Sequence, residues 1–186
     1  MNKYYLGIDL GSTTSKAIIV NQDDEIVGRG ITNTRANYEV AAEIARMEAV
    51  YNARFSLLKR SMGGEIETYP EFARYIDELE DAFAYLEFRA RSDRLYRQMI
   101  ETATSHFAID RQPPLLSALG RIFDGMLPHI REKYLNEDLA SSNQFFRDVF
   151  FEEYNARVAG LDASLFEPMM TLFDKSITPV ENQIIP

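Results

Sequence analysis

The fold is decided by the stretch GIDLGSTTSK at residues 7–16. An apolar run ends at Asp9, a glycine follows two residues later, and hydroxyl side chains occupy residues 12–15. Glycine permits a turn that residues carrying a β-carbon resist. We therefore predict an apolar strand over residues 4–8, a tight polar turn at residues 11–13, and a returning strand over residues 14–20.

The chemistry of this turn is that of a phosphate site. A turn of this kind directs backbone N–H groups and hydroxyls toward one point, where they can hold an anion. The groups that would cradle phosphates belong to Gly11, Ser12, Thr13 and Thr14. Lys16 on the returning strand can add a point charge. Asp9 would repel phosphate directly, so its expected task is to hold a Mg²⁺ ion that neutralises the phosphates.

Two known phosphate loops are excluded, because the stretch is neither a Walker A sequence nor a dinucleotide fingerprint. A plain hairpin turn is the alternative, since Asp, Gly, Ser and Thr are ordinary turn residues. Lys16 could equally be a solvated strand lysine. Residues 21–24 (NQDD) have the chemistry of a second hairpin loop, and a third strand is expected over residues 25–31. The result is a β-meander whose edges must pair with something or stay exposed.

From Asn37 onward the apolar period becomes helical. Asn37 is expected to cap a helix whose apolar stripe comprises Val40, Ile44, Met47, Tyr51, Phe55 and Leu58. Further helices are predicted after Pro70, over residues 116–126 and 145–154, with a short piece at 165–173. We divide the chain into a β part (1–36), a helical block (37–175) and an extended linker (176–186) containing Pro179.

Composition excludes several classes of protein. The formal charge of −9 argues against binding nucleic acid, which needs a basic face. Cysteine is absent, so the chain offers no thiolate to zinc, a disulfide or an iron–sulfur cluster. The two histidines, His106 and His129, are far apart, which disfavours a histidine metal site. With no apolar run of membrane length and no signal peptide, we expect a cytoplasmic location without membrane contact.

The pattern Asp9-x-Gly11-x-Thr13 resembles the first phosphate motif of the actin, sugar-kinase and heat-shock-chaperone ATPases. The longer string at residues 6–17 is similar to ATPases that drive low-potential electron transfer. These are the ATPase subunits of benzoyl-coenzyme A reductases and the activators of 2-hydroxyacyl-coenzyme A dehydratases. Residues 28–42 resemble the larger ATPase subunit of benzoyl-coenzyme A reductase, in which a helical insertion follows this hairpin.

The resemblance implies an α/β fold, namely the N-terminal meander of an actin-like, ribonuclease H-like ATPase domain with a large all-α insertion. It implies ATP and Mg²⁺ as ligands, and a second ATPase subunit and the reductase core subunits as partners. Family members also carry a second phosphate motif, an adenosine motif and cysteines for a [4Fe–4S] cluster. This chain has none of them, so we expect it to be the N-terminal portion of a longer subunit, with little ATP hydrolysis by itself.

Two other functions stay open at this point. One is an activator of a 2-hydroxyacyl-coenzyme A dehydratase, against which the long helical insertion speaks. The other is a non-catalytic interaction module, in which the helical block binds partners and the hairpin is vestigial.

Overall fold

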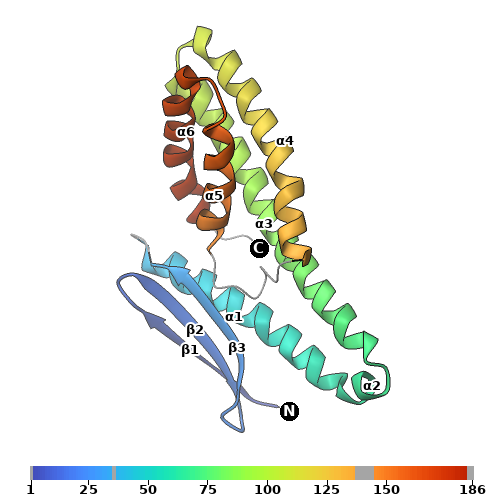
Figure 1. Cartoon of the computed structure of the whole chain (residues 1–186). Coiled ribbons are helices and arrows are strands. Elements are labelled where there is room, and N and C mark those ends of the chain that lie inside the picture. The colour runs from blue at the N-terminus through green and yellow to red at the C-terminus, as the bar shows by residue number, and fades with distance from the viewer. Residues whose placement is uncertain (1, 35–36, 137–144, 184–186) are drawn as a thin grey trace. The chain divides into compact units, whose positions relative to one another are not determined.

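The computed structural model describes residues 2–34, 37–136 and 145–183. A three-stranded antiparallel sheet comes first, in the order β1 (Tyr4–Leu10), β2 (Thr14–Asn21), β3 (Ile26–Asn33), and helices follow (Figure 1). The helices are α1 (Tyr38–Ser61), α2 (Gly63–Thr68), α3 (Glu71–His106), the 3₁₀ turn η1 (Ile109–Arg111), α4 (Gln112–Asn136), α5 (Phe146–Val158) and α6 (Ala163–Glu181). The mixed α/β class is confirmed, while the actin-like arrangement stays a prediction.

The chain forms two compact units, residues 1–80 and 81–185, and the division falls inside α3. The first unit therefore holds the sheet together with α1 and α2. This differs from the predicted boundary after residue 36, because α1 packs directly against β3 and β2 and shares their core.

Small residues allow α1 to lie very close to the sheet. Ala45, Ala49 and Ala53 are buried at spacing four along α1, and they pack onto Gly28 and Gly30 of β3. A β-carbon built on Gly30 would come within 2.1 Å of the Ala45 carbonyl oxygen, and one on Gly28 within 2.2 Å of the Ala49 oxygen. Glycine is required at both positions by this close approach of helix and strand.

The buried face of α1 is therefore not the predicted stripe. Of the six large apolar residues in that stripe only Phe55 is buried; Leu58 is exposed and the other four are half-buried. Hydrophobic periodicity gives weight to large side chains, whereas a helix that touches a sheet at backbone distance needs alanine there.

The start of α1 agrees with its prediction. The Asn37 side chain accepts hydrogen bonds from the N–H groups of Glu39 and Val40, as an N-cap does. Later in the same unit, Lys59 pairs with Asp77 and Glu80 on the first turns of α3, at 2.8 and 2.7 Å.

The second unit has a separate apolar core, contributed by α3, α4, α5 and α6. Phe150 and Tyr154 of α5 are fully buried, and the Phe150 ring stacks on Phe173 of α6 at a centroid distance of 5.9 Å. Thr102 and Ser176 share a hydrogen bond of 3.0 Å inside it.

The predicted extended linker is wrong for residues 176–181, which continue α6. Ile177 and Val180 are buried in the core of the second unit, so their burial offsets the backbone hydrogen bond that Pro179 cannot donate. Residues 184–186 of that prediction lie outside the described part. None of the helices among the described residues is both long and apolar enough to cross a bilayer.

Candidate functional site

The predicted phosphate turn lies between β1 and β2. The strands are paired up to Leu10 and Ser15, and beyond that pair the Gly11 N–H donates to the Thr14 carbonyl at 3.2 Å. Ser12 and Thr13 at the tip are exposed, while Gly11 and Thr14 are half-buried. The structure thus brings residues 11–14 together in one short loop, with its two hydroxyl side chains at the tip open to solvent.

Glycine is needed at position 11 for a steric reason. A β-carbon there would lie 2.7 Å from the Thr14 carbonyl oxygen, a distance that real β-carbons essentially never show. The backbone of Gly11 has an ordinary negative φ, because no glycine of the described residues has a positive one. The requirement is therefore space between the two sides of the turn and not an unusual backbone conformation.

Asp9 and Lys16 lie directly opposite each other on β1 and β2. Cross-strand partners point to the same face of a sheet, and alternation places this pair on the face opposite Ser15, Ala17 and Ile19. Those three residues are buried on the side covered by α1. Asp9 and Lys16 are exposed, and neither takes part in an ion pair with any described residue. Both charges therefore remain available to a ligand beside the turn.

Two residues outside the predicted site also support the turn. The Thr34 N–H donates to the Thr13 carbonyl at 2.8 Å, and the hydroxyls of Thr34 and Ser15 lie 2.6 Å apart. Ser15 is fully buried. Its alternation with Ala17 and Ile19 was a signal for the inward orientation of Ser15, but the sequence held no signal for its pairing with Thr34.

The turn fits the ligand set that Mg²⁺ and a phosphate chain would need. Mg²⁺ is commonly held by one or two carboxylates together with phosphate oxygens and water, so a single aspartate is an adequate protein contribution. Across the described residues, acidic and histidine side chains form no group of three or more that could hold a metal by themselves. His106 ends α3 and His129 lies on α4, so neither histidine belongs to the turn.

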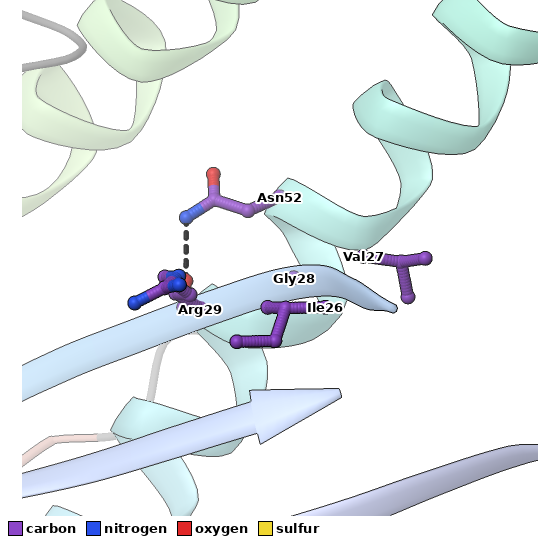
Figure 2. A pocket seen from close by; sticks show the side chains of 5 residues that line it. All are labelled: Ile26, Val27, Gly28, Arg29 and Asn52. Atoms are coloured by element: carbon purple, nitrogen blue, oxygen red, sulfur yellow. Dashed lines mark hydrogen bonds between the residues drawn. The ribbon is translucent and has the colours of Figure 1, made fainter. Parts of the chain in front are cut away.

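A shallow depression is present at the other end of the sheet, and it is lined by Ile26, Val27, Gly28, Arg29 and Asn52. Figure 2 shows the Asn52 side chain directed at the strand, where its amide nitrogen donates to the Arg29 carbonyl at 2.7 Å. The lining is mostly strand backbone and aliphatic side chain.

In the second unit, the buried carboxylate of Glu153 lies beside two cations and a histidine. Its two oxygens lie 2.8 Å from Lys133 Nζ and 2.5 Å from Arg157 Nη1, and His129 Nε2 is 3.4 Å away. Burial acts to raise the pKa of Glu153, but the hydrogen bonds from Lys133 and Arg157 outweigh it, so the pKa lies below its usual value. This cluster joins α4 to α5 and has the character of a structural ion-pair network.

No protein-family model, no curated protein and no solved structure matches this chain. Its function therefore has to be inferred from the residues and geometry of the turn.

Proposed function

We propose that the β1–β2 turn binds the phosphates of Mg²⁺-ATP, and that the chain acts as an ATP-binding part of a subunit driving low-potential electron transfer to a benzoyl-coenzyme A reductase core. The observation that carries this proposal is the turn itself. It is tight enough to require Gly11, exposes two hydroxyls at its tip, and has Asp9 and Lys16 side by side on one face.

The roles of the residues follow from their chemistry. The N–H and hydroxyl groups of residues 11–14 would donate to phosphate oxygens, and the ammonium group of Lys16 would neutralise part of their charge. Asp9 would hold Mg²⁺ beside the same oxygens. The ion supplies further neutralisation of the phosphate chain when it is bound.

The wider proposal rests on the resemblance of residues 6–17 and 28–42 to the ATPase subunits named above. It includes an actin-like ATPase domain, a cytoplasmic location, and a second ATPase subunit and the reductase core as partners. Because the chain lacks cysteine, any [4Fe–4S] cluster of such a complex would take its thiolate ligands from outside these residues.

Titration calorimetry with ATP, in the presence and absence of Mg²⁺, tests the proposal on this chain. We expect binding that depends on Mg²⁺ and that Asp9→Asn weakens, because the amide removes the negative charge that holds the ion. Asp23→Asn is the matched control, since Asp23 is an exposed aspartate in the β2–β3 loop at the far end of the hairpin.

The outcomes separate the parts of the proposal. If Asp9→Asn binds ATP as the wild type does, still with a dependence on Mg²⁺, Asp9 does not hold the ion, and the phosphate turn stands. An absence of ATP binding by the wild-type chain would overturn the phosphate site in this chain.

A further inference from the structure

Thr34, one residue beyond β3, contacts the residue before Thr14 and the residue after it, where the turn joins β2. Its N–H donates to the carbonyl of Thr13 at 2.8 Å, and its hydroxyl lies 2.6 Å from that of Ser15. Thr13 and Ser15 are the residues that flank Thr14 in the sequence. A single residue at the end of the neighbouring strand thus fixes the backbone before Thr14 and the side chain after it.

This contact determines where the N–H of Thr14 points. The Thr13 carbonyl and the Thr14 N–H belong to one planar trans peptide, so they point in opposite directions. Because the carbonyl is held toward β3, the N–H is directed to the other side of β2, where the turn lies. The Thr14 carbonyl faces that side too, since it accepts from the Gly11 N–H.

The Thr14 N–H remains without a carbonyl partner in the turn. A closed two-residue hairpin loop would have this N–H donate to the Gly11 carbonyl, and the described residues do not make that bond. A donor on a half-buried residue, with a fixed direction and no acceptor among the described residues, is a suitable group for an anion.

We propose that Thr34 is a positioning residue for phosphate binding: it keeps the Thr14 N–H directed into the turn. This inference rests on the proposed phosphate site. It adds Thr34 and Ser15 to that site, although neither is expected to touch the ligand.

The double variant Ser15→Ala/Thr34→Val tests the side-chain half of this arrangement. Replacing both hydroxyls avoids leaving one of them buried without a partner, so the fold should be nearly as stable as that of the wild type. We expect Mg²⁺-tripolyphosphate and Mg²⁺-ATP to bind about tenfold more weakly. A tenfold loss of affinity is about the net contribution of one ordinary hydrogen bond. Thr34→Ser keeps the hydroxyl and should bind both ligands like the wild type.

A matched control is available in the second unit. Thr102→Val/Ser176→Ala removes a different hydroxyl pair, which is buried and has an oxygen separation of 3.0 Å, and should leave phosphate binding unchanged. Thr34→Pro provides the backbone test, because proline removes the N–H that holds the Thr13 carbonyl. It should weaken tripolyphosphate binding at least as much as the double variant, with unfolding followed in parallel by circular dichroism.

The outcomes distinguish this inference from the function on which it rests. If the wild type binds tripolyphosphate and both Thr34→Pro and the double variant bind it equally well, Thr34 has no positioning role and the phosphate site stands. The positioning role of the Thr34 hydroxyl is also overturned if Thr34→Ser binds as weakly as the double variant. If the wild type binds neither tripolyphosphate nor ATP, the site and the positioning role are both overturned.

Discussion

The Glu48 carboxylate on α1 accepts a hydrogen bond from the backbone N–H of Ile31 at 2.9 Å, on the outer edge of β3. Four residues further along α1, the Asn52 amide donates to the Arg29 carbonyl on the same edge. An exposed strand edge normally presents a row of unpaired backbone groups. Here one helix bonds two of the outward backbone groups of β3, as well as covering one face of the sheet.

The opposite edge is not protected in this way. All seven residues of β1 are exposed, and no side chain of the described residues bonds to its backbone. Because the Gly11 N–H faces β2, alternation directs the N–H groups of Leu10, Ile8 and Leu6 outward.

Hydrogen exchange followed by NMR should therefore differ between the two edges. We expect the amide of Ile8 to exchange much faster than that of Gly7, and the amide of Ile31 to be protected although it faces outward. Glu48→Ala should accelerate exchange at Ile31, because it removes the acceptor. Arg54→Ala, an exposed change on the same helix, should not. Equal exchange at Ile8 and Ile31 would contradict the asymmetry.

A second prediction concerns the contact of α1 with β3. Gly30→Ala should destabilise the first unit by about 3 kcal/mol, the upper end of the usual cost of overpacking, because the new methyl group would meet helix backbone. Gly64→Ala is the control, since nothing lies within 4 Å of a β-carbon at that helical position. It should be neutral or slightly stabilising, as alanine favours helix over glycine. Urea denaturation of the two variants measures the difference.

The Glu153 cluster predicts a specific pH dependence of stability. The pKa of Glu153 is lowered in the folded chain, so its stabilising contribution is present above the unfolded value, near 4.5, and is lost as the pH falls through the folded value. Glu153→Gln should cost about 3 kcal/mol at pH 7, because it removes the buried carboxylate on which Lys133 and Arg157 converge.

The difference in free energy of unfolding between wild type and Glu153→Gln should shrink below pH 4.5. Urea denaturation at neutral pH and at a pH well below that value measures it, with Glu132→Gln, an exposed change on α4, as the control. A difference that is the same at both pH values would show that Glu153 does not act through its charge.

The features that were predictable from sequence are local ones. The Asn21 side chain accepts from the N–H groups of Asp23 and Glu25, and Asp24 has a φ of 60°, as the chemistry of that loop indicated. The Asn37 cap is local as well. The opposition of Asp9 and Lys16 is also a local feature, because the turn of a short hairpin fixes the register of its two strands.

The features that were missed depend on residues distant in sequence. Ser15 meets Thr34 across 19 positions, and that meeting depends on the register of β2 with β3. The alanine face of α1 depends in the same way on two glycines of another element. Local patterns carry no information about which partner an element will meet, so the spacing of the large apolar residues did not indicate the small-residue face of α1.

The helical course of residues 176–181 provides the last prediction, because an extended linker and a helix respond oppositely to substitution. Ile177 is buried, so Ile177→Ala should cost between about 2 and 5 kcal/mol, as for other large-to-small changes in a core. Pro179 is exposed within the last turns of α6, and Pro179→Ala restores a backbone donor to the helix. It should raise the melting temperature, whereas in an extended linker it would change nothing.

Lys175→Ala, an exposed change in the same helix, is the control for surface effects. Circular dichroism melts of the three variants distinguish a helix from an extended linker. Only a packed helix loses stability on substitution of Ile177 and gains stability on substitution of Pro179.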